Sequence, residues 1–401
     1  MHIRMPRRLG GVITALTLAA ALPAVGTSAA QAAQTEPTAR AEQNSGSNPG
    51  DVVSVEDSAF HPLPGQPTNT KAWKIHYRST DALGQPNTVS GTVIVPQDGR
   101  KGPRPLITYA VGTVGLGDQC APSAGFPHGT TLEANLIQQL TWRGWAVAVT
   151  DYEGLGTPGE HTYTAGRSAG HAMLDAARAA QRIPAAAASG LTPDSPIGIM
   201  GYSQGGQASS WAAELKASYA PELKVKGTAT GGVPAKLAPL ASVHDGSYGA
   251  GLLFMAASGL DAAYPELRLD SYLNDSGKKL IGTLRGNCVA ANAVLGAFKK
   301  ISDMTHTNPL DTPEWQRRLG DSDLGGTKPD HPVYLYHAVA DELIPYGLGR
   351  QLGKDWCAKG GNVKWRTILL GEHVSAVITE ATAVQNWLAA RFADRPTNGT
   401  C

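Results

Sequence analysis

The sequence predicts an α/β protein, in which helices flank an open, mostly parallel β-sheet and a helical cap is inserted late in the chain. Short apolar runs bounded by turn residues alternate with helical stretches from Asp51 onward, as in sheets whose strands are connected by helices. One long stretch of different character interrupts this alternation. The 401 residues, 42% of them hydrophobic and 17% charged, are enough for a soluble core that carries such an insertion.

The N-terminal segment has the features of a secretory signal peptide. An arginine-rich start precedes the apolar run Leu9–Val25, and an Ala-x-Ala cleavage pattern ends at Ala32. A membrane helix is the alternative, but the run is short and no stop-transfer charges follow it. We therefore expect residues 1–32 to be cleaved after Ala32, by the Sec or the twin-arginine route, and the protein to be secreted. Residues 33–50, polar and rich in Gly, Pro and Ser, predict a flexible leader.

The sheet and its helices follow from the apolar runs of residues 51–394. The runs predicted as strands are short and bounded by turn residues, as buried parallel strands should be. These strands are Trp73–Arg78, Thr88–Val95, Pro105–Val111, Ala146–Thr150, Ile197–Met200, Val225–Thr230, Val333–His337 and Lys364–Leu369. The predicted helices are Ala169–Ile183, Gly205–Tyr219, Gly347–Lys359 and Val374–Phe392.

The interruption runs from Pro234 to about Lys328. A loop of that length without secondary structure is improbable, and this one contains apolar and amphipathic stretches. We expect residues 234–328 to form a helical cap over the carboxyl edge of the sheet, and residues 51–233 and 329–394 to form the core. Residues 395–401 remain as a C-terminal tail.

Two segments match the pattern G-x-S-x-G, which marks a nucleophile on a sharp strand-to-helix turn. Around Ser203, the apolar run PIGIM precedes the motif and a helix that opens with small residues follows it. Around Ser168, the preceding residues are polar and broken by Gly and Pro, so no strand leads in. The sequence therefore predicts Ser203 as the nucleophile, and Ser168 as the cap of the following helix.

A serine nucleophile needs an imidazole base held by a carboxylate. His373 follows a predicted strand through Gly371-Glu372 and immediately precedes a helix, which favours it as a loop-borne base. His306 falls in a polar cap loop, and His331 and His337 lie before and within a strand, where structural roles are expected.

The carboxylate should follow the preceding strand, in the segment Ala338–Pro345. We expect Asp341 to fill this role. Its neighbour Glu342 is an open alternative, and Glu372 is a weaker one because it adjoins His373 in sequence. Asp341 could instead cap the next helix.

Two backbone N–H groups are candidates for the oxyanion hole. One belongs to Gln204, directly after the nucleophile. The other belongs to Thr113, in the Gly-rich loop after the strand PLITYAV, where N–H groups can converge on an anion. This loop lacks the patterns of nucleotide-binding loops.

Four cysteines remain after cleavage, and an even number in an exported protein suggests two disulfides among three possible pairings. They are too scattered for a zinc site. The pairing we prefer is Cys120 with Cys288 and Cys357 with Cys401, the second of which would hold the C-terminal tail.

The segments Gly112-Thr113 and Cys120–Ser123, the elbow GYSQGG, the acid loop ADELIP and the histidine in GEH together resemble the secretory lipase family. This family includes the Candida lipase A type and many exported actinobacterial lipases and esterases. The resemblance runs from about Asp51 to Phe392.

The resemblance implies an α/β-hydrolase core with a cap after the sixth core strand, Ser203 as nucleophile, Asp341 as acid and His373 as base. It also implies a disulfide from Cys120 to a cap cysteine, here Cys288. One departure concerns the oxyanion strand end, where relatives often carry His-Gly-Thr and this chain has Val111 before Gly112 and Thr113. What fixes the loop is therefore open.

These observations predict a secreted serine ester hydrolase, a lipase or carboxylesterase, that needs no metal or organic cofactor. The expected partner is a small-molecule or lipid ester, with at most transient contact to a lipid interface. Loss of the signal segment lowers the formal net charge from +1 to −2, which gives no reason to expect nucleic acid. The apolar stretch Gly249–Ala257 fits an acyl tunnel or an ordinary buried helix.

Two other functions stay open. One is a feruloyl or other aryl esterase with the same three residues. The other is a non-catalytic binding protein on a hydrolase scaffold, which is disfavoured because all three residues are retained. The oligomeric state is not indicated.

Overall fold

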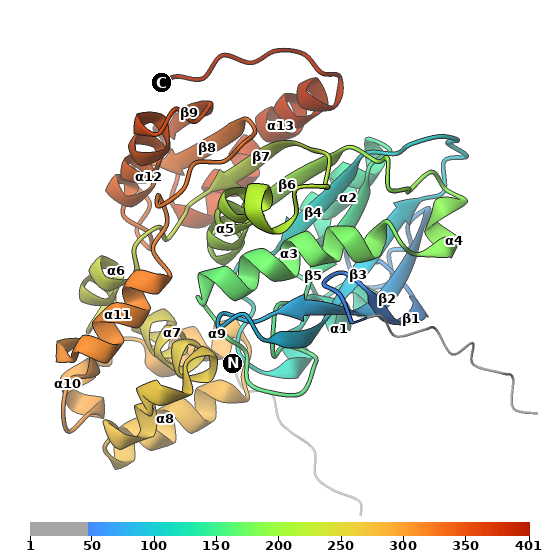
Figure 1. The fold of residues 1–401 in the computed structure, drawn as a ribbon. Coiled ribbons are helices and arrows are strands. Elements are labelled where there is room, and N and C mark those ends of the chain that lie inside the picture. Colours follow the sequence, from blue (N-terminus) through green and yellow to red (C-terminus); the bar gives the residue numbers. More distant parts are fainter. Residues whose placement is uncertain (1–46) are drawn as a thin grey trace, which may run out of the picture. The chain divides into compact units, whose positions relative to one another are not determined.

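The computed structural model describes residues 47–401 (Figure 1). The predicted signal peptide, its cleavage site after Ala32 and leader residues 33–46 lie outside the described part. The end of the predicted leader is folded, contrary to expectation. Gly50 is buried, and its N–H donates to the carbonyl of Arg78 at 2.7 Å. Gly50 has φ +79°, a turn conformation that glycine adopts without strain.

Nine strands within residues 47–401 form a single mixed sheet in the order β1-β2-β3-β5-β4-β6-β7-β8-β9. The run from β5 to β9 is parallel, whereas β1, β2 and β3 are antiparallel at one edge. The bounds are β1 Val52–Ser58, β2 Thr70–Thr80, β3 Pro86–Pro96, β4 Leu106–Ala110, β5 Ala146–Thr150, β6 Ile197–Tyr202, β7 Val225–Gly231, β8 Val333–Ala338 and β9 Val363–Ile368. The mostly parallel α/β fold is confirmed.

The strand that the sequence analysis does not predict is β1. Its four leading residues are half-buried, and Glu56 and Asp57 are exposed, so it shows neither a sustained apolar run nor clear alternation. It is an edge strand, paired on one side with β2. By contrast, every residue of β5 and β6 is buried, and such central parallel strands are easily recognised.

Helices cover both faces of the sheet (Figure 1). α3 (Gly166–Ala180), α5 (Gln204–Tyr219) and α12 (Tyr346–Ala358) share one face, where Trp356 of α12 donates its indole N–H to Glu214 of α5 at 2.7 Å. α2 (Ala134–Trp142) and α13 (His373–Phe392) cover the other. Shorter helices in the connections are η1 Asp118–Cys120, α1 Pro122–Gly125, η2 Phe126–His128 and α4 Pro184–Ala187.

Further helices lie between β7 and β8, in the segment expected to form the cap; we call residues 234–328 the helical insertion. Figure 1 shows these helices, yellow to orange, gathered beside one end of the sheet. They are α6 Leu237–His244, α7 Ala250–Ala263, η3 Pro265–Leu267, η4 Leu269–Ser271, α8 Asp275–Arg285, α9 Val289–Gly296, α10 Ile301–Met304, η5 Pro309–Asp311 and α11 Pro313–Asp321.

The helical insertion has its own apolar cluster, which also includes Leu116 and Tyr163 from the core. The insertion therefore packs on loops at the end of the sheet, as well as on itself. Across residues 47–401, no helix combines the length and apolar character that crossing a bilayer requires.

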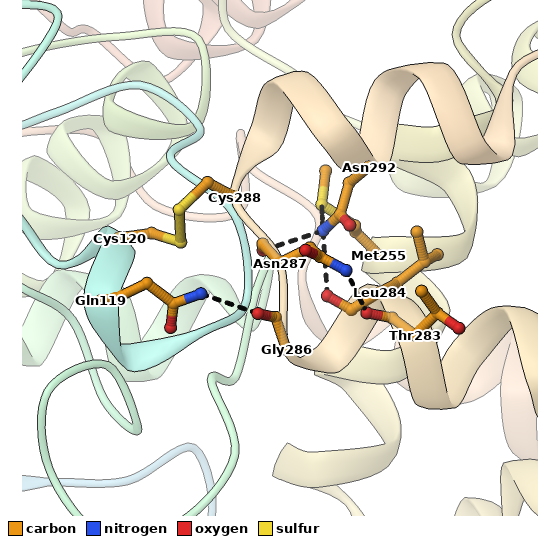
Figure 2. The surroundings of a disulfide bond; sticks show 9 residues. All are labelled: Gln119, Cys120, Met255, Thr283, Leu284, Gly286, Asn287, Cys288 and Asn292. Atoms are coloured by element: carbon orange, nitrogen blue, oxygen red, sulfur yellow. Dashed lines mark hydrogen bonds between the residues drawn. A yellow bond between two sulfur atoms is a disulfide. The ribbon is translucent and has the colours of Figure 1, made fainter. Parts of the chain in front are cut away.

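A disulfide between Cys120 and Cys288 joins the loop after β4 to the helical insertion (Figure 2). Backbone bonds flank it, because the N–H groups of Leu116 and Val289 donate to the carbonyls of Asn287 (3.0 Å) and Val114 (2.8 Å), respectively. The loop after β4 is thus attached to the insertion by covalent and backbone contacts.

The second disulfide joins Cys357 of α12 to the last residue, Cys401, so both disulfides have the pairing preferred from the sequence. The C-terminal tail follows the free edge of β9. The N–H of Thr400 donates to the carbonyl of Val363 at 2.7 Å, and the Thr400 hydroxyl accepts from the N–H of Trp365 at 2.9 Å.

Candidate active site

Ser203 lies in the turn between β6 and α5, as the sequence predicts. Its backbone has φ 59° and ψ −121°, a strained conformation for a residue with a side chain. The flanking glycines allow this turn. A Cβ on Gly201 would lie 2.1 Å from the carbonyl oxygen of Gly205, and one on Gly205 would lie 2.0 Å from that of Ala110. The tight turn lifts the serine hydroxyl out of the end of the sheet.

The structure brings the three residues predicted as a triad into contact. The Ser203 Oγ lies 2.9 Å from Nε2 of His373, and Nδ1 of His373 lies 2.8 Å from Oδ2 of Asp341. The hydroxyl can therefore donate to Nε2 while Nδ1–H donates to the carboxylate. These side chains come from the β6–α5 turn, the start of α13 and the loop after β8.

Asp341 is held as an ionised acceptor. Its Oδ1 accepts the backbone N–H groups of Leu343 and Ile344 at 3.1 and 2.7 Å. Burial disfavours its charge, but hydrogen bonds from His337 and His373 outweigh burial and hold the pKa of Asp341 well below its ordinary value. The alternative role as a helix cap is not observed, because α12 begins at Tyr346 with Pro345 as its N-cap residue.

His337 is a site residue to which the sequence analysis assigns only a structural role. It is completely buried in β8, and its Nε2 lies 2.9 Å from the carbonyl oxygen of Ile344 and 3.2 Å from Oδ2 of Asp341. Nε2–H therefore donates to both. The position of His337 four residues before Asp341 is a sequence signal that could have indicated this contact.

His373 lies at the start of a helix, whereas the sequence analysis expected it in the loop directly before that helix. It is the first residue of α13. Its backbone N–H donates to Oε2 of Glu342 at 2.9 Å, and its carbonyl accepts the Tyr202 hydroxyl at 2.8 Å. The neighbouring Glu372 caps the helix by accepting the N–H of Ser375 at 2.9 Å. Glu342 and Glu372 therefore contact backbone groups, while Asp341 contacts the ring.

The loop after β4 lies against Ser203, since a Cβ on Gly112 would lie 3.8 Å from Cβ of Ser203. Glu133 fixes this loop. Its Oε1 accepts the N–H of Gly112 at 2.6 Å, and its Oε2 accepts the hydroxyl of Tyr109. Burial raises the pKa of Glu133. Nothing in the sequence around Glu133 pointed to this role. The Glu133 carboxylate is what fixes the loop after β4, the point that Val111 at the strand end left open.

The two predicted oxyanion donors flank Ser203 from opposite elements. Gln204 is the first residue of α5, so its N–H has no intrahelical acceptor. Thr113 lies next to Gly112, and its hydroxyl is 2.9 Å from that of Tyr163. Among residues 47–401, the backbone N–H groups of Thr113 and Gln204 have no hydrogen-bond acceptor.

Ser168 does not cap a helix, contrary to prediction. It lies inside the first turn of α3, whose N-cap residue is Ala165. Its hydroxyl donates to Oε2 of Glu153, and the side chain is buried. The residue before the motif belongs to a loop that reaches the helix without a strand, so no elbow forms.

A pocket opens beside Ser203 and Gln204 and extends into the helical insertion. Its walls are mostly apolar. They include Leu252, Leu253, Ala256, Ala257 and Leu260 of α7, together with Trp315 and Leu319 of α11. Part of the stretch Gly249–Ala257 thus lines a space that reaches Ser203. The part of the chain that the structure covers has no cluster of three or more His, Cys, Asp or Glu side chains placed to hold a metal ion.

Comparisons with known proteins agree on one family. Residues 125–400 match the family described as Secretory lipase. A "Probable inactive lipase MT1628" of Mycobacterium tuberculosis is 32% identical over 87% of this chain and 79% of its own length. "Secreted triacylglycerol lipase LIP7" of Malassezia globosa is 29% identical, over 88% of this chain and 78% of its own.

Among solved structures, Candida antarctica lipase A in its closed state superimposes with a TM-score of 0.79 at 24% identity, covering 88% of this chain and 84% of the other. That likeness shows the α/β-hydrolase fold. The family match and the relatives support an ester hydrolase of the lipase and esterase kind. This chain therefore belongs to the secretory lipase family.

Proposed function

We propose that this protein is a secreted serine ester hydrolase that acts through an acyl-enzyme on Ser203. The observation that carries the proposal is the continuous contact from Ser203 through His373 to Asp341 at the mouth of an apolar pocket. Nucleophile, base and orienting carboxylate are the minimal parts of such a site.

In the proposed reaction, Ser203 attacks the ester carbonyl while Nε2 of His373 takes its proton. The new oxyanion receives hydrogen bonds from the backbone N–H groups of Gln204 and Thr113. His373 then gives the proton to the leaving alcohol, which departs and leaves an acyl-serine. Water, activated by the same imidazole, releases the acid and restores Ser203. Asp341 keeps Nδ1 protonated and stabilises the imidazolium.

The acyl group of a lipid ester is the substrate part we assign to the pocket. Leucine and alanine side chains of α7 supply most of one wall, and burial of each methylene contributes about 0.8 kcal/mol. The Malassezia relative is named a triacylglycerol lipase, which agrees with this class. An aryl ester with the same chemistry is the competing substrate.

Activity itself needs a direct test, because one relative is named as probably inactive. We expect a fluorophosphonate probe to label the purified protein and mass spectrometry to find the adduct on the peptide that contains Ser203. The hydrolysis rates of p-nitrophenyl butyrate, p-nitrophenyl palmitate, tributyrin and methyl ferulate then define the substrate. Preference for methyl ferulate would contradict the lipid assignment, and absence of labelling would contradict the reaction.

Export is part of the proposal. The disulfides Cys120–Cys288 and Cys357–Cys401 suit an oxidising compartment, and the Malassezia relative is named as secreted. Expressed with its leader in an exporting host, the chain should be recovered from the medium. Its first residue should be Ala33, and an intact Met1 there would contradict cleavage.

A further inference from the structure

We propose that the loop between β5 and α3 (residues 151–165, here the β5–α3 loop) holds both oxyanion donors in place, through Tyr163 and His161. The inference rests on the proposed function, since it names what positions Thr113 and Gln204 for that reaction. Tyr163 and His161 are positioning residues, because each acts through a residue beside the reacting carbonyl.

Tyr163 holds the loop that carries Thr113. Its hydroxyl lies 2.9 Å from Oγ1 of Thr113, and Tyr163 is buried. Burial raises the pKa of Tyr163 to about 12, still further above neutral pH than the ordinary value of about 10, so the phenol is a hydrogen-bond donor throughout the neutral range. A second tyrosine of the same loop, Tyr152, donates its hydroxyl to the carbonyl of Val111. The β5–α3 loop therefore contacts the oxyanion segment on both sides of Gly112.

His161 holds the side chain of Gln204. Its Nδ1 lies 2.9 Å from the carbonyl oxygen of Glu153, so Nδ1 carries the proton and Nε2 is left as an acceptor. The Gln204 carboxamide Nε2–H donates to this acceptor at 3.1 Å. Burial lowers the pKa of His161 to about 4, which keeps the ring neutral and able to accept. A fixed Gln204 side chain fixes the start of α5, and with it the N–H that faces the oxyanion.

The β5–α3 loop is itself rigidly held. At its start, the carboxylate of Asp151 accepts the N–H of Ser123 at 2.8 Å and the hydroxyl of Ser90 at 2.6 Å. Within it, Tyr152 and Thr164 have φ values of 69° and 66°. Positive values are strained in residues with side chains, so the surrounding contacts must enforce them.

Glu153 is the centre of those contacts. Its Oε2 accepts the hydroxyls of Thr162, at 3.1 Å, and of Ser168, while its carbonyl accepts Nδ1–H of His161. Ser168 belongs to the second G-x-S-x-G segment. That segment therefore contributes a contact that supports the oxyanion donors.

The first test is a double-mutant cycle on the Tyr163–Thr113 contact. Tyr163→Phe removes the hydroxyl and keeps the ring, and Thr113→Val removes the partner hydroxyl and keeps the backbone N–H. We expect each to lower kcat for p-nitrophenyl butyrate about tenfold, less than the roughly 10²–10³-fold loss when a whole oxyanion donor is removed. The double variant should be no slower than either single variant, because both remove the same contact.

The matched control is Tyr219→Phe. Tyr219 also donates a hydroxyl to a buried partner, Asp175 at 2.8 Å, but it lies at the far end of α5 from Ser203. It should lower the melting temperature about as much as Tyr163→Phe and leave kcat unchanged. Because Tyr163 also lines the pocket, kcat and KM are measured separately, and the loss should fall on kcat.

The second test separates the two bonds of His161. His161→Gln can present a carboxamide oxygen near the position of Nε2, whereas His161→Asn keeps a donor near Nδ1 and does not reach Gln204. We expect kcat of His161→Gln to stay closer to wild type than that of His161→Asn. The affinity for a trifluoromethyl ketone, whose adduct forms an oxyanion, should fall in step with kcat.

Equal losses in the two His161 variants, or additive losses in the Tyr163–Thr113 cycle, would overturn the inference. A wild-type protein that fails to react with fluorophosphonate would instead overturn the proposed function. Wild-type activity in all variants would leave the proposed function standing and remove the positioning role. Thermal melting of each variant identifies any that fail to fold.

Discussion

The same five-residue pattern occurs twice in this chain and has two different structural outcomes. Ser203 follows a fully buried strand and has a strained backbone with its hydroxyl 2.9 Å from an imidazole. Ser168 follows an irregular loop, lies in a helical turn, and gives its hydroxyl to Glu153. The pattern alone does not create a strand-to-helix elbow. A buried strand that leads into the motif does, because strand, turn and helix must then meet within a few residues.

The glycines of the two segments differ in the same way. In the first segment they allow strand, turn and helix backbones to meet at the elbow. In the second they allow α3 to approach α5, since a Cβ on Gly166 would lie 2.0 Å from Nε1 of Trp211 and one on Gly170 would lie 2.9 Å from the N of Ala212. One pair of glycines shapes a site and the other packs two helices.

The largest difference between the two segments should appear in kcat when the serine of each is replaced by alanine. Ser203→Ala should lower kcat on the order of 10⁶-fold, as removal of a triad nucleophile does elsewhere. Ser168→Ala should lower it less than tenfold, through the support it gives to Glu153. Initial rates on p-nitrophenyl butyrate measure both. Loss of activity in Ser168→Ala with retention in Ser203→Ala would reverse the assignment of the two segments.

The loss of stability caused by each Gly→Ala substitution should increase as the new Cβ comes closer to neighbouring backbone atoms. Gly205→Ala should lower the free energy of unfolding by at least the upper end of the roughly 1–3 kcal/mol typical of overpacking, and Gly170→Ala by less. Gly282→Ala in α8, where a Cβ meets nothing within 4 Å, is the control and should gain about 0.5–1 kcal/mol. Urea unfolding tests the order. Equal costs at Gly205 and Gly170 would mean that the elbow is no tighter than the helix contact.

Two buried aspartates, one near the Ser203 segment and one near the Ser168 segment, should make the free energy of unfolding depend on pH in opposite directions. The lowered pKa of Asp341 stabilises the fold near neutral pH, and this contribution is lost as pH falls below about 4, the ordinary range of Asp. For Asp175 of α3, burial raises the pKa to about 6. Between about pH 4 and about pH 6, Asp175 is protonated in the folded state and ionised in the unfolded chain. The contribution of Asp175 to the free energy of unfolding therefore falls by about 2–3 kcal/mol as pH rises from about 4 to about 6.

Urea unfolding from pH 2.5 to 7, compared between wild type and each Asp→Asn variant, isolates these two contributions. The difference between wild type and Asp341→Asn should shrink below about pH 4. The difference between wild type and Asp175→Asn should change mainly between about pH 4 and 6. Parallel curves in either comparison would refute the corresponding pKa shift.

The smallest loss of stability should come from Ser168→Ala. It removes one buried hydrogen bond to Glu153, so the free energy of unfolding should fall by about 1–1.5 kcal/mol. Thr162→Val, which removes the other hydroxyl on the same Oε2, is a matched comparison and should cost a similar amount. No change in either variant would mean that water replaces the hydroxyls at Glu153.

The contact between Ser203, Asp341 and His373 could be anticipated from chain order, because each residue follows a predicted strand and the structure brings all three together. β5 was also predicted with its observed bounds. β1 was missed because its exposed acids hide the strand pattern. Because β1 was not predicted, the strand numbering shifts by one. The insertion expected after the sixth strand therefore follows the seventh strand of the structure.

The contacts around the three residues could not be predicted. Glu133, His337 and His161 reach the site from α2's start, from inside β8 and from the β5–α3 loop, and no local pattern marks any of them. Their roles depend on which side chains meet across elements distant in sequence. A buried His or Glu can be recognised as support only when its partners are seen.

The last residues of the chain protect one free strand edge and one thiol together. If the chain ended before Arg395, the outer N–H and C=O groups of β9 would be open to pairing with another molecule, which is how exposed strand edges nucleate aggregates. Cys357 would at the same time be left unpaired beside that edge. Proteolytic trimming or a C-terminal truncation would thus create a self-associating surface together with the means to crosslink it.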